Sequence, residues 1–403
     1  MTRTIFFVVA MLASSVSSAA APEKKTSKQS ISGHLVLEYR YFPDSPLVSE
    51  QADQGLSFAL LPEFYKKFEN INTSFTFAPF ARVDRYDKER SHNDIRELMV
   101  HTIRPSWELR TGIGKVFWGV TESQHLVDVI NQTDAVEATD GEEKLGQPMV
   151  NLTLKRPWGS TDLFVLPYFR ERTFPGTRGR PRSVPRVDTS LTQYESSRKE
   201  KHVDWAARWS RSIKQWDIGL SHFSGTSRDP RFTLGVNASG EPVLAPYYDQ
   251  INQTGIDVQA TFGSWLWKLE AIQRRGQLTP YHAVTAGFEY SRPGIFKTRY
   301  DAGFLMEFLY DSRQDPRTAP FERDVLLGTR LGFNDTASSE LLAGVIVDTN
   351  QSERFYFVEF SRRLGRSYKI ALEGRSSSGL QSTSPLYSQR FDDHIQLELY
   401  FYF

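Results

Sequence analysis

The chain of 403 residues contains no cysteine, which excludes disulfide frameworks and cysteine-based metal sites. It also lacks any run of about 18 unbroken apolar residues, so no membrane-spanning helix is predicted. Its 49 basic and 48 acidic side chains leave a formal net charge of +1. This balance argues against a nucleic-acid partner and against a polybasic membrane tether.

Catalytic and metal-binding motifs are scarce as well. The eight histidines are scattered singly, and none forms an H-E-x-x-H pattern. A G-x-S-x-G nucleophile motif is absent, and "GIGKVF" lacks the third glycine of a dinucleotide loop. We therefore predict a protein that is not an enzyme and that uses no metal or other cofactor. A hydrolase assembled from distant residues at the rim of a barrel remains an alternative.

The first 21 residues have the pattern of a secretory signal peptide. Arg3 gives a basic start, an apolar stretch follows from Ile5 to Ala13, and small residues lead to Ala21. Residues 22–30 are polar and are predicted to be a disordered periplasmic lead-in. Residues 31–403 show no linker, so they are predicted to form a single β-barrel in a bacterial outer membrane.

Aromatic and charged residues are both abundant, at 13% and 24% of the chain. In "TRYDAGFLMEFLYD" the apolar positions are even-numbered and include Tyr300, Phe304 and Phe308, whereas Asp301 and Glu307 lie between them. A repeat of two indicates strands, and an apolar face opposite a charged face is typical of a barrel with lipid outside and water inside. The predicted fold is all-β, a transmembrane antiparallel up-and-down β-barrel.

About eighteen strands are predicted, an even number that places both termini on the periplasmic side. Sixteen is possible, because two of the segments, 55-65 and 94-103, alternate poorly. A soluble β-sandwich is the alternative fold, but strands of about ten residues with charges near their middle favour a water-filled barrel. The predicted strands are 31-40, 55-65, 71-82, 94-103, 106-116, 147-155, 160-171, 202-211, 215-224, 253-262, 264-275, 282-290, 298-310, 322-333, 339-348, 354-363, 366-376 and 393-403.

Strand parity predicts which charged side chains face the lumen, although a one-residue slip would exchange the two faces. Both signs are present, so the wall itself should select weakly between anions and cations. The predicted lining residues are Glu108, Arg110, Asp204, Arg208, Lys268, Glu270, Arg299, Asp301, Glu307, Arg330, Lys369, Glu373 and Glu398.

Two long loops carry opposite charge. Residues 117–145 contain seven acids and one lysine, and residues 173–201 contain seven bases and three acids. If the acidic loop folds into the mouth opposite basic side chains, a solute crosses a transverse field, and Glu122, Asp128 and Asp134 contribute to the constriction. The alternative is that both are solvated surface loops.

The acidic loop contains most of the stretch "GIGKVFWGVTESQHLVDVINQTD", in which Gly112 and Gly114 precede Trp118, Gly119 and the segment with Asp128, Asn131 and Asp134. This stretch resembles a pattern in proteobacterial outer-membrane barrels of the porin and alginate-export type. Lys115 stands where those proteins often have arginine. The resemblance implies a channel with a loop that enters the barrel, and it does not identify the solute.

The chain ends in "DHIQLELYFYF", with Leu399, Phe401 and Phe403 on one face. This ending resembles the C-terminal strand that the barrel assembly machinery of the outer membrane recognises. The physical basis would be β-augmentation, in which an exposed strand edge pairs with the machinery and the aromatic face adds specificity.

The sequence therefore predicts a porin-like outer-membrane channel for passive diffusion of small hydrophilic solutes. Its predicted partners are membrane lipid, the assembly machinery and the solute. A closed barrel that serves as a structural or adhesion scaffold is the alternative from another class, since ion pairs would then fill the interior. The solute, the direction of transport and the oligomeric state stay open.

Overall fold

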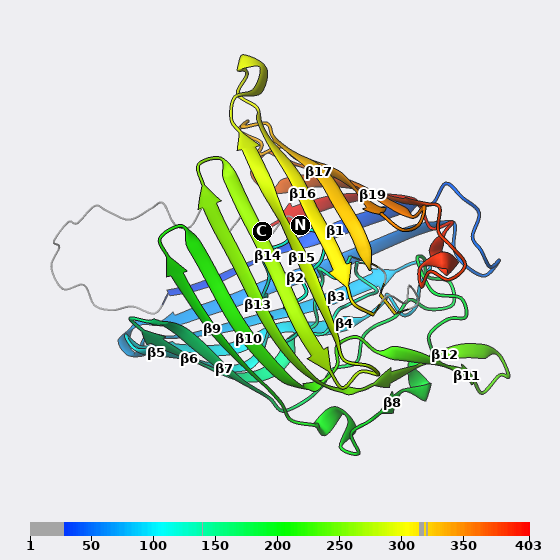
Figure 1. The fold of residues 1–403 in the computed structure, drawn as a ribbon, viewed down its shortest axis with the longest axis horizontal. Coiled ribbons are helices and arrows are strands. Elements are labelled where there is room, and N and C mark those ends of the chain that lie inside the picture. The colour runs from blue at the N-terminus through cyan, green and yellow to red at the C-terminus, as the bar shows by residue number, and fades with distance from the viewer. Residues whose placement is uncertain (1–27, 139, 314–317, 320) are drawn as a thin grey trace.

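The computed structural model describes residues 28–138, 140–313, 318–319 and 321–403. The expected signal peptide and residues 22–27 of the lead-in lie outside the described residues. Eighteen antiparallel strands form one closed barrel in which neighbours follow chain order (Figure 1). The predicted all-β class, the up-and-down barrel and the count of eighteen strands are confirmed, and the alternative of sixteen strands is wrong.

All eighteen predicted segments correspond to barrel strands, and most boundaries differ by one to three residues. Strand β1 begins at Lys28, within the stretch predicted as lead-in. The barrel strands are β1 (Lys28–Tyr41), β2 (Gln54–Phe68), β3 (Thr73–Asp84), β4 (Asn93–Ile103), β5 (Trp107–Gly114), β6 (Gln147–Arg156), β7 (Gly159–Leu166), β9 (Asp204–Ile213), β10 (Trp216–Thr226), β13 (Gln250–Phe262), β14 (Trp265–Arg275), β15 (Tyr281–Arg292), β16 (Asp301–Asp311), β17 (Arg323–Gly332), β18 (Glu340–Asp348), β19 (Arg354–Leu364), β20 (Tyr368–Ser378) and β21 (His394–Tyr402).

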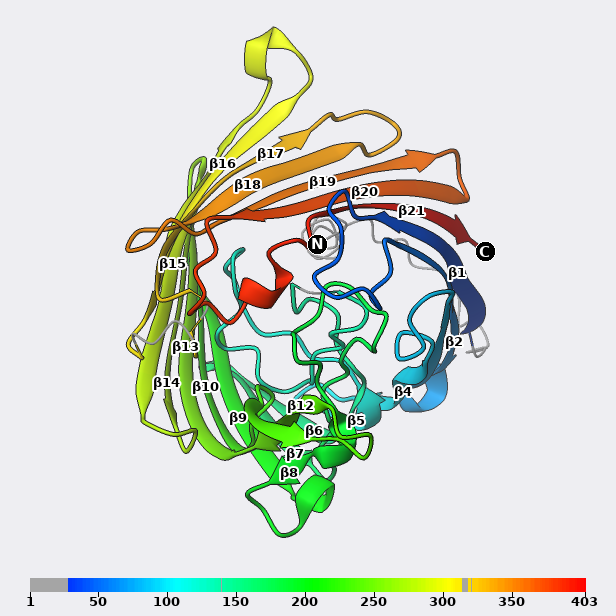
Figure 2. The ribbon, with the colours of Figure 1, turned by 90° about the vertical axis from the view of Figure 1, so that its right-hand side faces the viewer.

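The last strand closes the barrel on the first. Strands β1 and β21 pair antiparallel, with Leu37 opposite Leu399. Beyond β21, Gly33 and Phe403 exchange both backbone hydrogen bonds, at 3.0 and 3.1 Å. Figure 2 looks along the barrel and shows β1 and β21 side by side. Closure leaves this sheet with no free edge.

The two faces of each strand differ as the alternation predicts. On β16, Phe304 and Phe308 point outward and are 48% and 46% exposed, whereas Glu307 points inward and is 1% exposed. Rings gather on the outer face near the turn between β13 and β14, where Trp265 contacts Trp267 and Tyr290 at centroid distances of 5.8 and 4.8 Å. The outer wall is thus apolar and partly aromatic, and the inner wall carries the charges.

The two poorly alternating segments have a backbone cause. Pro62 in β2 and Pro79 in β3 lack the N–H that a sheet ladder needs. The pairing of β3 with β4 shifts register between Ala78 and Pro79. A shift of one residue exchanges faces, so buried inward residues change from even-numbered Arg96 to odd-numbered Met99 along β4.

A separate three-stranded sheet lies beyond the barrel strands, and the sequence analysis did not predict it. It contains β8 (Gln193–Tyr194), β11 (Arg231–Val236) and β12 (Pro242–Tyr248). Figure 1 shows this sheet at the end of the barrel where the long loops lie. None of the described helices is long and apolar enough to cross a membrane. They are the 3-10 turns η2 (Glu69–Ile71), η3 (Thr189–Leu191), η4 (Lys199–Lys201), η5 (Ile295–Lys297) and η6 (Tyr387–Gln389).

Gly112 in β5 provides a test of the barrel backbone. Its φ is +137°, and an added Cβ would lie 2.0 Å from the carbonyl oxygen of Leu98. We expect Gly112→Ala to lower the free energy of unfolding by about 2 kcal/mol or more, because β5 must shift to relieve this overlap. The measurement is urea unfolding of the detergent-solubilised protein, followed by tryptophan fluorescence. Gly374→Ala is the matched control, since no atom lies within 4 Å of its added Cβ. Equal midpoints for both variants would contradict the prediction.

Candidate functional site

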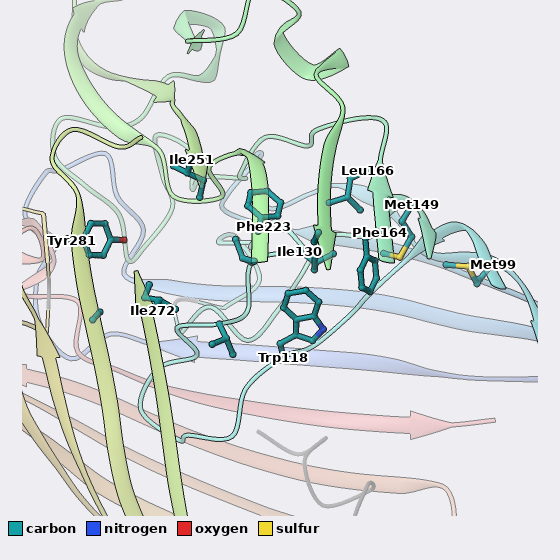
Figure 3. Packing of buried hydrophobic residues seen from close by; sticks show 14 residues of the cluster. Met99, Trp118, Ile130, Met149, Phe164, Leu166, Phe223, Ile251, Ile272 and Tyr281 are labelled. Atoms are coloured by element: carbon teal, nitrogen blue, oxygen red, sulfur yellow. The ribbon is translucent and has the colours of Figure 1, made fainter. Parts of the chain in front are cut away.

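The loop between β5 and β6, described at residues 115–138 and 140–146, leaves the barrel wall after Gly114 and runs through the interior (Figure 2). Its apolar stretch includes Trp118, Val127, Val129 and Ile130, all of them at most 5% exposed. These side chains pack against apolar residues on the inner wall between β4 and β15 (Figure 3). Burial of this apolar surface holds the first half of the loop inside the barrel.

Two acidic residues of the wall receive the backbone of the loop. The buried carboxylate of Glu270 accepts hydrogen bonds from the N–H groups of Val120 and Thr121 at 2.7 and 3.0 Å, and from the Thr121 hydroxyl at 2.7 Å. The carboxylate of Glu307 accepts N–H bonds from Glu122 and Ser123, both at 2.8 Å. The loop donors satisfy the buried carboxylates, which would otherwise be costly to desolvate.

At the turn of the loop, four charged side chains form what we call the Glu122 cluster, comprising Glu122, Lys268, Glu289 and Arg330. Glu122 contacts Arg330 at 3.0 Å and Lys268 at 3.7 Å. Glu289 lies 3.9 Å from Arg330 and 4.0 Å from Lys268. The side chain of Arg330 is 28% exposed. The cluster therefore presents charges of both signs to the interior of the barrel.

The second half of the loop is fixed by basic residues on other parts of the wall. The carboxylate of Asp134 lies 2.6 Å from the Arg96 guanidinium and 3.2 Å from the His92 ring, and it is fully buried. Glu137 contacts Arg82 at 2.8 Å. These contacts come from β3, β4 and the loop between them. Farther along the loop between β5 and β6, Asp140 contacts Arg375 of β20 at 3.0 Å.

Two histidines pair with acidic residues of the loop between β5 and β6. His92 lies in the loop between β3 and β4, and His125 lies in the loop between β5 and β6 itself. Burial disfavours the charged ring of His92, but the hydrogen bond to Asp134 and its charge prevail and raise the pKa of His92. Burial opposes ionisation of Glu142, yet its hydrogen bond to His125 at 2.8 Å and the charge of that ring lower the pKa of Glu142 to about 2. The same pairing raises the pKa of His125 against the effect of burial. Both pairs are ion pairs below the raised histidine pKa values.

The basic loop between β7 and β9, residues 167–203, also buries groups against other loops of the chain. Arg180 forms a buried ion pair with Asp392 at 2.7 Å, and its guanidinium lies 4.4 Å from the Phe42 ring. The N–H of Gly176 donates to Asp87 at 3.1 Å. Neither long loop is simply a solvated surface loop, because both bury charged or backbone groups against other parts of the chain.

The structure brings the predicted lining residues Glu122, Lys268 and Arg330 together, with Glu270 and Glu307 beside them as supports. Asp134, which belongs to the loop and was also predicted at the constriction, is fully buried against Arg96 and His92. The other predicted residues form the following pairs: Asp128 with Lys144 at 3.2 Å, Arg208 with Asp257 at 2.5 and 2.7 Å, Asp204 with Arg228 at 2.7 Å, Glu108 with His101 at 2.9 Å, Arg110 with Glu108 at 3.8 Å, Glu373 with Arg375 at 2.7 Å, and Glu398 with the Tyr400 hydroxyl at 2.7 Å.

Arg299, Asp301 and Lys369 lie apart from the Glu122 cluster. Arg299 is exposed in the turn before β16, and Asp301 accepts a bond from the N–H of Gly294 at 2.9 Å in the same turn. Lys369 on β20 lies 5.3 Å from the Tyr400 ring. The three residues of the predicted assembly signal, Leu399, Phe401 and Phe403, lie on the outer face at the closing edge.

Sequence reasoning missed a charge network centred on Glu38 of the wall. Glu38 of β1 is 1% exposed and contacts Arg82 at 2.9 Å, Arg90 at 2.8 Å and Arg40 at 3.1 Å. The alternation in "LVLEYRY" does place Glu38 and Arg40 on one face. Their partners come from β3 and the loop after it, so only the register of the folded sheet identifies them.

Comparison with known proteins supports the fold. No family model matches the chain, and no curated protein matches it. Among solved structures, OccK3 (OpdO) of Pseudomonas aeruginosa is similar at 9% identity and a TM-score of 0.54, covering 93% of this chain and 95% of that one. A BenF-like porin from Pseudomonas fluorescens Pf-5 is similar at 10% identity and a TM-score of 0.54, with 94% and 98% covered. This chain has a porin-like fold.

The two wall carboxylates provide a test of how the loop is held. We expect Glu270→Gln and Glu307→Gln each to weaken the attachment of the loop by about 2 kcal/mol, because hydrogen bonds to a charged acceptor are worth about 1.5–3 kcal/mol. Amide hydrogen exchange in residues 118–127 should then accelerate about 30-fold. Glu340→Gln is the control, since this inward residue of β18 makes no hydrogen bond to the described part of the loop. Unchanged exchange in both wall variants would contradict the role of these carboxylates.

The His92 pair predicts a dependence on pH. Because its folded pKa is raised above the ordinary 6.5, His92 contributes stability that is complete below pH 6.5 and is lost as the pH rises through the folded value. We therefore expect the unfolding midpoint of the unchanged protein to exceed that of His92→Asn by more at pH 6 than at pH 9. Leu220→Ala, a change on the outer wall at a side chain that does not titrate, should give the same difference at both values. A His92 difference that grows towards pH 9 would refute the prediction.

Proposed function

We propose that this protein is an outer-membrane channel that lets small hydrophilic solutes diffuse passively along its lumen. The observation that carries the proposal is the path of residues 115–146, which cross the inside of a closed barrel and place the Glu122 cluster within it. A loop that narrows a barrel lumen and adds charges at that point limits passage by size and by field. No cofactor is needed for such a mechanism.

The outer surface supports placement in a membrane. Large apolar side chains on the outer wall, such as Leu220, Phe304 and Leu397, are 41% to 48% exposed. An exposed apolar belt of this extent is unfavourable in water and favourable against lipid tails. The sequence pattern of residues 1–21 supports export.

We further propose that Leu399, Phe401 and Phe403 form the signal for barrel assembly. The resemblance of residues 112–134 to barrels of the alginate-export type rests on the sequence alone.

The charges of the lumen support weak rather than strict ion selectivity. Glu122 is bound to two bases, and Arg208 is neutralised by Asp257 through two hydrogen bonds. A solute that passes the Glu122 cluster meets both signs within a few ångströms. Neutral, zwitterionic and weakly charged hydrophilic solutes suit such a site better than strongly charged ones.

A closed scaffold is the second candidate function, and the many buried ion pairs inside the barrel favour it. Arg82, Arg90 and Arg96 all end on buried carboxylates, which are Glu38 on the inner wall and Asp134 on the loop inside the barrel. Such a filled interior would suit a barrel whose outer loops bind a partner. The two functions differ in one measurable property, because only a channel conducts ions.

Ion selectivity in planar bilayers tests the channel. The unchanged protein should give discrete conductance steps. Glu122→Gln should shift the reversal potential in a salt gradient towards anion preference, and Arg330→Gln should shift it towards cation preference, since each removes one sign from the cluster. Glu241→Gln, in the exposed turn between β11 and β12, should leave it unchanged. Absence of conductance, or equal shifts in all three variants, would contradict the proposal and favour the scaffold.

A further inference from the structure

Four of the eight tryptophans lie near the short turns of neighbouring strands, and we call them the tryptophan edge. They are Trp107 in β5, Trp158 in the turn between β6 and β7, Trp209 in β9 and Trp216 in β10. Figure 1 shows β5, β6, β7, β9 and β10 side by side. Trp158 and Trp216 are 54% and 44% exposed, and Trp209 is the direct partner of Leu220 on the outer wall. A ring with an apolar body and a polar N–H favours the boundary between lipid tails and water.

Two arginines lie among these tryptophans. Arg104 follows β4, its backbone N–H donates to the carbonyl of Trp107 at 2.8 Å, and its guanidinium lies 5.7 Å from the Trp107 ring. Arg156 is the last residue of β6 and is exposed. Its neighbour Lys155 points into the lumen and pairs with Glu108. Because side chains alternate along a strand, Arg156 points to the outer face.

Carbonyl oxygens of neighbouring turns hold both guanidinium groups in place. Nη1 of Arg104 donates to Ile71 in the turn between β2 and β3, at 2.8 Å. Nη1 of Arg156 donates to Ser106 in the turn between β4 and β5, at 3.0 Å. Each Nη1 also donates to the carbonyl of the residue before its own, at 2.8 Å. A carbonyl oxygen carries no formal charge, so these bonds fix the guanidinium groups without neutralising them.

The other nitrogens of the two groups retain their donors. All hydrogen bonds from these guanidinium groups to the described residues come from Nη1. Within the described ranges, neither Arg104 nor Arg156 forms an ion pair with a carboxylate. Nε and Nη2 lie in one plane, and their N–H groups are spaced to bind two oxygens of one phosphate. Each arginine therefore presents a fixed pair of donors and a positive charge to an anion.

Arg211 of β9 extends the positive charge along the same edge. It is exposed and is the direct partner of Ile218 on the outer face of β10. It lies two positions after Trp209 and therefore on the same face. The Trp209 ring packs closely on Gly159, because a Cβ added to that glycine would lie 2.5 Å from the ring Nε1. Basic and aromatic groups thus alternate from Arg104 to Arg211 along the outer wall.

We infer that the tryptophan edge binds the headgroup phosphate of an anionic glycerophospholipid, in the membrane leaflet next to the short turns. Arg104 and Arg156 bind phosphate oxygens through Nε and Nη2, and Arg211 adds attraction for the negative headgroup. The tryptophan rings pack against the glycerol and the upper acyl chains. Each basic side chain at a membrane surface adds to the affinity for anionic lipid. The inference rests on the membrane placement proposed above and is independent of conduction.

The test is native mass spectrometry of the full mature protein in a non-ionic detergent, titrated with phosphatidylglycerol or with phosphatidylcholine. The first phosphatidylglycerol should bind about 10-fold more tightly than the first phosphatidylcholine. Arg104→Gln and Arg156→Gln should each weaken phosphatidylglycerol binding about 5-fold and phosphatidylcholine binding less, because each removes one charge. Glutamine keeps a donor for the turn carbonyls, so the turns should hold. Arg85→Gln is the matched control, since this exposed arginine lies 5.7 Å from the Tyr86 ring at the opposite end of the barrel.

Three outcomes would overturn the inference. One is an unchanged protein that binds both lipids with the same affinity. A second is a loss in Arg85→Gln as large as in the two edge variants, which would place the lipid elsewhere. The third is displacement of phosphatidylglycerol by millimolar inorganic phosphate, which would assign the arginines to a free anion. These measurements are made in detergent, so a protein that fails to conduct in a bilayer still gives a result.

Discussion

Closure of the sheet is the constraint on which the rest of the structure depends. Once β21 pairs with β1, all eighteen strands have one face outside and one face inside, and side chains sort between them by parity. The inner face then encloses many charges in a limited volume. These charges need partners, because a buried unpaired charge is far more costly than an exposed one.

The partners come largely from the long loops, and this explains why the loop between β5 and β6 lies inside. Its N–H groups meet Glu270 and Glu307, and its own acids Asp134 and Glu137 meet Arg96 and Arg82. The apolar residues around Ile130 add a hydrophobic contact with the wall. Three kinds of interaction thus hold one segment across the lumen, and the charges left at its turn form the Glu122 cluster.

The strands could be predicted from the sequence because alternation is a local property. The residues of β16 reveal both faces without any knowledge of the neighbours. The prediction was weakest at 55-65 and 94-103, where Pro62, Pro79 and a register shift interrupt the alternation. The sheet of β8, β11 and β12 was missed because its strands are short, at two to seven residues, and lie outside the barrel pattern.

The site could be predicted only in part. The resemblance of residues 112–134 to outer-membrane barrels implied a loop that enters the barrel, while the charge of residues 117–145 left a solvated surface loop as the alternative. The parity of β14 and β17 indicated Lys268 and Arg330. Pairing was not visible, because Glu122 and Arg330 are 208 positions apart and meet only through the curvature of the wall. The sequence also gave no distinction between an acidic loop residue that faces the lumen, such as Glu122, and one that is fully buried, such as Asp134.

The most direct measurement is the single-channel conductance of the refolded mature protein before and after deletion of residues 121–143. A lumen narrowed by this loop predicts discrete steps for the unchanged protein and larger steps, with selectivity shifted towards anions, after deletion. The shift follows from the removal of acidic residues that include Glu122, Asp128 and Asp140. Steps of unchanged size and selectivity would place the loop outside the path of ions, and absence of conductance in both proteins would contradict the channel itself.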